Sequence, residues 1–527
     1  MCLYYKRMKP IRRIKKINGI EYWYEDVPYY DPVKKQTRHT SNYLGKNVNG
    51  VPVKVRTEGI PGPSISAVPK EAFTYGNLLP LQQIIQDLHI DEYLSTLASK
   101  SEKETILAIA INRLLHPVAM HLVSTWYEES ALFLTNPNLH LSSQSISELL
   151  STIGNSGVPE EFMQLLIRNL GTDATLIYDI TSLSSYSQLI SLLEYGYNRD
   201  GLDLPQVNFS LILDTHQAIP VMYDIYQGSI VDVVTLKNTI KKIGAIGVNK
   251  YTLVLDRGFF SQGNLEELIQ EGFSFVIPAS LTLKQVKEVL TEAQHDLESP
   301  QYLQKYQKNP IFVKPISFDV NGNDLKGFCY YDLKREQDER NLFYIRLHDL
   351  KQKLESLKIP RWRKPDEIFK EWAGKFSNYF SWHVQGNQFV VEIRNNAVSQ
   401  RVNRMGKQII LSHGPLDWKE CLTVYRERDY IEKTFRTLKQ DLQVLPLNVK
   451  KESTMKGFLF VTFISLILRM KLLKQMKDAG LLEDYTLDGI LLELSKIKKI
   501  RLVTGETVTT EISKKQRTIL DALGLCA

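Results

Sequence analysis

The chain has 527 residues, of which 43% are hydrophobic and 24% are charged. This length suits several domains with buried cores, and the composition excludes a disordered or fibrous protein. The net charge of +7 lies at the ends: residues 1–60 hold 13 Lys and Arg against 5 Asp and Glu, and residues 433–527 hold 17 against 10. Basic flanks around an acidic centre suit a protein that holds a polyanion with its ends and metal cations with its centre. Two solvated faces would explain the same charges.

The cysteines and the most apolar segment indicate where the protein resides. Four cysteines, at positions 2, 329, 421 and 526, are far apart and have no zinc-ligand spacing, which favours a reducing cytoplasm without disulfides. The most apolar window, residues 458–468, is 11 residues long, whereas a membrane span needs about 20, so it predicts a buried helix. The N-terminus lacks the apolar stretch of a secretory signal. We expect a cytoplasmic protein that makes no membrane contact.

The N-terminal third predicts a small β module followed by helices. Residues 1–62 are basic and rich in β-branched and aromatic residues, and Asn18-Gly19 is a hairpin dipeptide between two strand-like runs. Residues 51–69 are rich in Pro and Gly and predict a linker. Residues 63–168 have the apolar spacing of helices and predict a helical domain.

The rest of the chain predicts an α/β core that is split by an insertion. Residues 169–280 contain short apolar runs that predict three strands, a helix, a strand, a helix and a further strand, which together imply a mixed sheet covered by helices. Residues 281–405 interrupt this order and predict an insertion domain. Residues 406–475 resume the core with a strand and then one long helix, and residues 476–527 form a basic C-terminal region.

Two aspartates follow predicted buried strands. Asp179 ends the run ATLIYD and Asp256 ends YTLVLD, and side chains at neighbouring strand ends can converge on one point. An Asp after a strand is more often a turn former or a helix cap, and we assign Asp214 to that role. Asp256 differs because Arg257 and a glycine follow it, and Arg257 adds a positive charge beside the carboxylate.

The predicted long helix contains the motif YRERDYIEKTFRTLK. Its residues Tyr425, Arg428, Glu432 and Lys439 lie at i, i+3, i+7 and i+14, which places them along one side of a single helix. Ile431, Phe435 and Leu438 on the other side are apolar and suit packing. Arg428 and Glu432 could also form an ordinary surface pair at i and i+4, with Lys439 solvated. The tyrosine in the charged row favours a functional face.

Three carboxylates from two strand ends and a helix suit a pair of magnesium ions. Magnesium prefers hard oxygen ligands, and two such ions can activate an attacking oxygen and stabilise a leaving oxygen at phosphorus. Asp179, Asp256 and Glu432 would then be both catalytic and metal-binding residues. Arg428 and Lys439 would contact phosphates, and Tyr425 would stack or donate a hydrogen bond nearby. The residues predict phosphoryl transfer on nucleic acid.

The same motifs resemble those of a known family. Asp179 within YDITSLSSYS, Asp256 within LDRGF and Glu432 within a YREK signature are similar to the DDE transposases of bacterial insertion sequences. The likeness covers roughly residues 170–475. It implies an RNase H-like core with Asp179 on the first strand, Asp256 after the fourth strand and Glu432 on a C-terminal helix, interrupted by a largely β insertion.

In relatives the insertion contacts transposon ends and stabilises a flipped base or a hairpin intermediate. Trp362, Trp372 and Trp382 lie in the insertion of this chain and are candidates for stacking on an extruded base, with Arg257 as a further DNA contact. The tryptophans could equally be core aromatics of the insertion.

The resemblance implies a transposase that nicks DNA at the ends of an insertion sequence, frees a 3′-hydroxyl and joins it to target DNA. It implies Mg²⁺ as cofactor, for which Mn²⁺ can substitute, and double-stranded DNA as partner, both terminal repeats and target. We expect a homodimer on DNA and a nucleoid-associated protein, with residues 1–62 and 476–527 as candidates for DNA binding or dimerisation. Two alternatives stay open: a metal-dependent nuclease without strand transfer, and a non-catalytic DNA-binding protein derived from a transposase.

Overall fold

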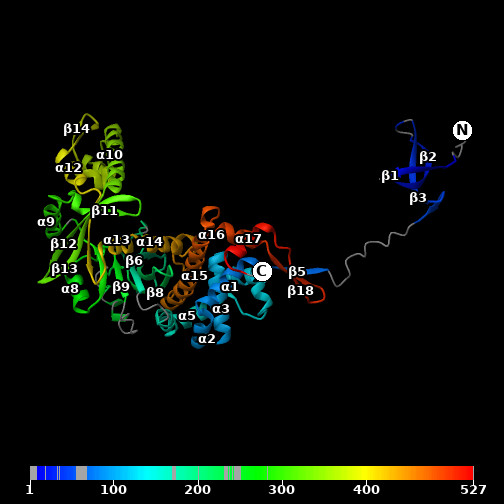
Figure 1. Cartoon of the computed structure of the whole chain (residues 1–527), viewed down its shortest axis with the longest axis horizontal. Coiled ribbons are helices and arrows are strands. Elements are labelled where there is room, and N and C mark those ends of the chain that lie inside the picture. Colours follow the sequence, from blue (N-terminus) through cyan, green and yellow to red (C-terminus); the bar gives the residue numbers. More distant parts are fainter. Residues whose placement is uncertain are drawn as a thin grey trace. The chain divides into compact units, whose positions relative to one another are not determined.

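The structure is a computed structural model. It describes residues 9–17, 19–31, 34, 36–54, 68–168, 174–196, 198–199, 201–230, 235–236, 238–239, 241–242, 251–281 and 283–525. The chain divides into two compact units (Figure 1). Unit 1 spans Met1–Ala72 with Ile500–Thr509, and unit 2 spans Phe73–Lys499 with Thr510–Ala527.

Unit 1 contains the β module that the N-terminal sequence predicts. Strands β1 (Ile11–Ile17), β2 (Ile20–Asp31), β3 (Gln36–Val48) and β4 (Val51–Val53) form an antiparallel sheet in that order. Ile17 pairs with Ile20, so the hairpin predicted at positions 18–19 is confirmed, although Asn18 itself lies outside the described residues. Most of the predicted linker, residues 55–67, also lies outside them.

Unit 2 begins with the predicted helices. The helices between residues 79 and 168 are α1 (Leu79–Asp87), α2 (Ile90–Leu97), α3 (Lys100–Leu115), α4 (Val123–Glu129), α5 (Ser143–Gly154) and α6 (Val158–Arg168). They share one hydrophobic core with the sheet, because α15 (Glu452–Asp478) packs against α3 and α5 on one side and against a strand of the sheet on the other. The apolar window 458–468 lies inside α15 and is buried, as predicted. No single helix of the described chain is long and apolar enough to cross a membrane, and one bent pair, Lys100–Leu115 with Met120–Glu129, passes that test only when taken together.

Glycines set the close approach of α5 and α15. A Cβ on Gly457 would lie 1.9 Å from the carbonyl oxygen of Leu150, and a Cβ on Gly154 would lie 1.9 Å from that of Ser453. The hydroxyls of Ser151 and Ser453 share a hydrogen bond of 2.7 Å across the same contact. The two backbones meet here because no side chain separates them.

Replacing Gly457 by Ala should therefore destabilise unit 2. The added methyl has no space beside the Leu150 carbonyl, so the helices must separate, and overpacking of this kind costs about 1–3 kcal/mol. Gly263→Ala is the matched control, because Gly263 lies in α8 (Gln262–Gln270) with nothing within 4 Å of its Cβ position. That change should stabilise slightly, since Ala is a better helix former. Thermal unfolding of both variants tests this, and equal melting temperatures would contradict it.

Among the described residues, the α/β part of unit 2 forms one mixed sheet of nine strands in the order β11-β12-β13-β16-β10-β9-β6-β7-β8. The predicted core supplies β6 (Ala174–Ser184), β7 (Gln206–Asp214), β8 (Ile219–Gln227), β9 (Tyr251–Leu255), β10 (Ser274–Pro278) and β16 (Lys407–His413). β6 pairs antiparallel with β7 and parallel with β9, and β9 is parallel to β10. The predicted succession of these strands along the chain is confirmed. The helix predicted between β8 and β9 lies largely outside the described residues.

The insertion is mixed, so the prediction of a largely β insertion was wrong. Its strands β11 (Leu303–Tyr306), β12 (Asn309–Val320) and β13 (Asn323–Asp332) extend the main sheet, because β13 pairs with β16. Its helices include α9 (Lys284–Gln294), the 24-residue α10 (Leu333–Ser356), α11 (Pro365–Ala373) and α12 (Asn395–Val402). With the hairpin of β14 (Phe380–Gln385) and β15 (Gln388–Ile393), α10, α11 and α12 enclose a separate hydrophobic cluster. The charged sequence of α10 hides its helical spacing, since only Phe343, Leu347 and Leu354 of this helix are buried.

The C-terminal region follows α15. It contains α16 (Leu487–Leu494), β17 (Lys498–Leu502), β18 (Thr507–Thr509) and α17 (Lys514–Ala522). Within unit 2, the carbonyl of Ile497 accepts hydrogen bonds of 3.1 Å from the backbone N–H groups of Tyr75 and Gly76. The chain at Ile497 therefore packs on the start of the helical part. The role of residues 476–527 in DNA binding or dimerisation stays a prediction.

Candidate active site

Asp179 lies in the middle of β6, so the expectation that it leaves the end of a strand was wrong. β6 pairs with β7 from Leu176 to Ser184, whereas its pairing with the shorter β9 stops at Tyr178. The strand therefore continues for five residues past the aspartate, paired with β7 on one side, and at its end the Ser184 carbonyl accepts a hydrogen bond of 2.9 Å from the Leu447 N–H. Asp179 is half-buried and directly follows Tyr178, the last residue of β6 that pairs with β9.

Asp256 directly follows β9, as predicted. Tyr178 pairs with Leu255 in the parallel register, so Asp179 and Asp256 occupy the next positions of adjacent strands. Neighbouring strands lie about 4.8 Å apart, and residues in parallel register point to the same face of a sheet. The two carboxylates thus start from adjacent points. Asp214 is a turn former as expected: its carboxylate accepts backbone N–H bonds from His216 and Gln217, and burial raises its pKa.

The single long helix predicted after β16 is broken into pieces, so that prediction was wrong. The chain forms α13 (Trp418–Arg426), α14 (Asp429–Arg436) and a π-helical segment Thr437–Asp441. At the break, the N–H groups of Arg428 and Ile431 bond to carbonyls three residues back, to Tyr425 and Arg428. This tighter turn changes the angle between residues, so the four residues of the motif do not follow one straight row. Tyr425 belongs to α13, Glu432 to α14 and Lys439 to the π-helical segment.

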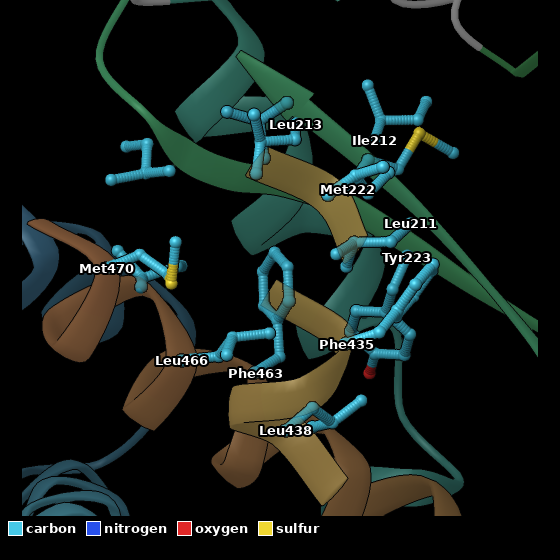
Figure 2. Close-up of a cluster of buried hydrophobic side chains, with 14 of the residues drawn as sticks. Leu211, Ile212, Leu213, Met222, Tyr223, Phe435, Leu438, Phe463, Leu466 and Met470 are labelled. Atoms are coloured by element: carbon cyan, nitrogen blue, oxygen red, sulfur yellow. The ribbon is translucent and has the colours of Figure 1, made fainter. Parts of the chain in front are cut away.

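The apolar side of α14 packs as the sequence predicts. Ile431, Phe435 and Leu438 are buried, and Figure 2 shows Phe435 and Leu438 among side chains of β7, β8 and α15. α14 also packs against β6, the strand of Asp179. Glu432 is on the exposed side of the same helix, with 52% of its side chain exposed. Burial of one side therefore fixes which way Glu432 faces.

Arg428 joins two of the three predicted ligands. Its guanidinium donates one nitrogen to the carboxylate of Asp256 and the other to that of Glu432, and 20% of its side chain is exposed. The ring centroid of Tyr425 lies 5.9 Å from the guanidinium carbon. Burial raises the pKa of the Tyr425 hydroxyl, Glu432 adds to this rise, and Arg257 opposes it. Asp256, Glu432, Arg428 and Tyr425 thus form one electrostatic cluster.

The carboxylates suit a hard divalent cation. Among the residues that the structure describes, no three His, Cys, Asp or Glu side chains are gathered closely enough to hold a metal ion. However, Asp256 and Glu432 already share one cation, the guanidinium of Arg428, and Asp179 starts in register beside Asp256. Three carboxylates are an oxygen donor set of the kind that Mg²⁺ takes. The residues therefore fit such an ion once the guanidinium is displaced.

The other side chains predicted to contact DNA differ in how exposed they are to solvent. Arg257 is exposed beside Asp256, and Lys439 is half-buried. Trp362 is 82% exposed. Trp372 is 40% exposed, and the Lys353 ammonium lies 4.3 Å from its ring centroid. Trp382 stacks on Phe369 with centroids 4.9 Å apart and packs against the hydrophobic cluster of the insertion, which favours a structural role for this residue.

The bridge from Arg428 to Asp256 is the feature that sequence reasoning missed. The pairing of Arg428 with Glu432 is visible as an i,i+4 spacing, but that spacing alone indicates only an ordinary surface pair. The bond to Asp256 joins residues 172 positions apart, and no sequence spacing signals it. A second such pair joins Arg426 to Asp332 at 2.7 Å, at the end of β13. The break between α13 and α14 lets these two nearby arginines reach different carboxylates.

Comparison with known proteins locates the chain in a family. No curated protein matches the sequence. Among solved structures, the piggyBac transposase synaptic complex with hairpin DNA is 13% identical, with 80% of this chain and 79% of that chain covered at a TM-score of 0.37. The Drosophila P element transposase strand transfer complex is 11% identical, with 74% and 87% covered at a TM-score of 0.18. These scores are too low to carry an argument.

Comparison of the sequence with family profiles identifies the family, which the structural comparison does not. The profile of the family described as "Transposase DDE domain" matches residues 172–468, which is more than half of the chain and contains Asp179, Asp256 and Glu432. The chain belongs to the transposase DDE domain family.

Proposed function

We propose that this transposase cleaves DNA at the ends of an insertion sequence and joins the freed 3′-hydroxyl to target DNA, with Asp179, Asp256 and Glu432 as ligands of divalent cations. Two observations carry the proposal: Asp179 and Asp256 follow residues that pair in parallel register, and Arg428 joins Asp256 to Glu432. When bound, Mg²⁺ or Mn²⁺ would activate the attacking oxygen and stabilise the leaving oxygen at phosphorus.

An RNase H-like core supports the proposal. The strand order β8-β7-β6-β9-β10, with β7 antiparallel and β9 parallel to β6, is the arrangement expected of that core. Asp179 is then on its central first strand and Asp256 follows its fourth, while α14 presents Glu432 beside β6. The fold thus brings together residues that are far apart in sequence.

Arg428 has two roles in this mechanism. In the described conformation it neutralises Asp256 and Glu432. A divalent cation needs the same oxygen lone pairs, so the guanidinium must release them. Once released, Arg428 is positioned to hold a DNA phosphate next to the reacting bond, since arginine binds phosphate through paired N–H groups. Tyr425, within reach of the guanidinium, would keep Arg428 oriented during this exchange.

The other candidate DNA contacts have separate roles. Arg257 and Lys439 would hold the phosphate backbone, and Trp362 is the most exposed of the three tryptophans for stacking on an extruded base. We propose that two copies of the chain act together on two DNA ends, and that the basic N-terminal and C-terminal regions contribute to end binding.

The test uses the purified protein and DNA that carries the repeats flanking its gene. With Mg²⁺, the wild-type protein should nick the 3′ ends of the element and then form joined products with target DNA, which sequencing of the junctions would reveal. Cleavage without joining would identify a nuclease. Binding without cleavage would identify a non-catalytic derivative. Either result would overturn the proposal.

A further inference from the structure

The N-terminal sheet presents two faces with different charge. Side chains of a strand alternate between faces, and the pairing of β1, β2 and β3 assigns each residue to one of them. We name the first the tyrosine face; its tyrosines and charged residues are Arg13, Lys15, Tyr22, Tyr24, Asp26, Tyr30, Tyr43 and Lys46. The second is the balanced face, and its charged residues are Arg12, Lys16, Glu21, Glu25, Asp31 and Arg38.

On the tyrosine face, aromatic rings and cations alternate. The Tyr43 ring centroid lies 6.0 Å from that of Tyr22 and 5.6 Å from that of Tyr24, across the β2–β3 pairing. The Lys15 ammonium lies 4.7 Å from the Tyr24 ring centroid. Tyr43 is 45% exposed, so the group is open to solvent.

The acidic residue of this face is already neutralised. Asp26 is 5% exposed, accepts a hydrogen bond from Ser41 and pairs with Arg13. Ser41 lowers the pKa of Asp26 most, and the charge of Lys15 contributes. Since one buried carboxylate faces Arg13, Lys15 and Lys46 in the described sheet, the tyrosine face has an excess of positive charge.

On the balanced face, each cation has an acidic neighbour. Arg12 bonds to Glu25 at 3.0 Å, Arg38 lies 3.7 Å from Asp31, and Lys16 is directly opposite Glu21 in the strand register. Trp23 is half-buried and donates its indole N–H to Asn47, whose amide in turn bonds to Glu21. This face therefore carries no excess charge among its described residues.

We propose that the tyrosine face of the N-terminal sheet binds duplex DNA. This proposal rests on the proposed function, in which the basic N-terminal region contributes to binding of the DNA ends. It assigns that binding to one surface of the region. Lys15 and Lys46 would pair with phosphates along one strand of the duplex, and the tyrosine hydroxyls between them would donate hydrogen bonds to phosphate oxygens. Exposed apolar side chains, among them Ile11 and Val51, also lie on this face, but its excess of positive charge and its tyrosine hydroxyls suit a polyanion.

Two charge-matched double variants of the full-length protein test the assignment. Lys15→Ala/Lys46→Ala removes two positive charges from the tyrosine face, and Arg12→Ala/Lys16→Ala removes two from the balanced face. Binding to a fluorescent 40-base-pair duplex (about four helical turns) carrying the terminal repeat is measured by anisotropy over a range of salt concentrations. The first variant should lose at least about tenfold in affinity at ~0.1 M salt, and its salt dependence should fall by about 1.8 in log–log slope, since each phosphate contact contributes about 0.9. The second should stay within about twofold of wild type and keep the slope.

Equal losses in both variants would show that only net charge matters and would overturn the proposal. A larger loss in the balanced-face variant would overturn it as well. The substituted side chains of both double variants lie on the surface of the sheet, so the melting temperature should be unchanged. If it falls, Tyr24→Phe/Tyr43→Phe is the second test, because it keeps the rings and removes the hydroxyls. That variant should also lose affinity if the proposal holds. If the wild-type protein cleaves and joins DNA but both double variants lose affinity equally, only the assignment to the tyrosine face is refuted. If the wild-type protein binds DNA but never cleaves it, only the proposed function is refuted.

Discussion

Glu432→Gln should lower DNA strand cleavage by about three orders of magnitude while leaving the fold intact. The amide has nearly the same shape as the carboxylate, but it lacks the negative charge that a divalent cation needs. Stabilisation of charge at phosphorus by a metal ion is worth several kcal/mol, and a loss of about 4 kcal/mol corresponds to ~1,000-fold in rate. Glu432 is exposed on one side of α14, opposite the buried Phe435 and Leu438, so the exchange disturbs no packing. Single-turnover cleavage of an end-containing duplex measures the effect.

Asp429→Asn is the matched control for this change. Asp429 lies in the first turn of the same helix and is exposed; its charge also acts on Tyr425, but the two carboxylates that Arg428 bridges are those of Asp256 and Glu432. Its removal should change the cleavage rate by no more than a few-fold. Similar losses in the two variants would mean that general negative charge on α14, instead of a metal ligand at 432, supports cleavage.

Arg428→Ala should raise the affinity for Mn²⁺ in the absence of DNA, by about tenfold. Its guanidinium and the ion compete for the same oxygens of Asp256 and Glu432, and hydrogen bonds to charged groups are worth about 1.5–3 kcal/mol before they are discounted for the exposure of these side chains. Calorimetry or the electron paramagnetic resonance signal of free Mn²⁺ measures the affinity without any need for catalysis. The same variant should bind cleaved DNA ends more weakly, because it lacks the phosphate contact.

Arg257→Ala distinguishes competition between a guanidinium and Mn²⁺ for carboxylate oxygens from the general effect of removing a positive charge near the site. Arg257 adds a positive charge beside Asp256, and no described contact joins it to two carboxylates. Its loss should raise the Mn²⁺ affinity less than the loss of Arg428. Arg428→Lys should give an intermediate affinity, since an ammonium keeps the charge but cannot span both carboxylates with a rigid fork. If Arg428→Ala binds Mn²⁺ no more tightly than Arg257→Ala, the bridge does not compete with the ion.

Local features of the site could be predicted because they depend on neighbours in sequence. The run YTLVL is apolar and β-branched, so β9 and the position of Asp256 after it follow from the sequence. The spacing of Ile431, Phe435 and Leu438 correctly predicts the buried side of α14 and of the π-helical segment after it. The family motifs point to the same three carboxylates. Helical periodicity fails at Arg428 because a tighter turn of a few residues leaves almost no trace in a hydrophobic pattern.

The sequence by itself determined the succession of strands along the core and the apolar side of the helix that carries Glu432, and it predicted the three acidic residues, since each depends on residue type and short-range spacing. Only the tertiary structure decided that Asp179 lies within a strand instead of at its end, that the insertion extends the main sheet, and that Arg428 bridges Asp256 and Glu432. These features arise where distant segments of the chain meet. Their pairing depends on the packing of the whole sheet against α14 and α15, which no local pattern encodes.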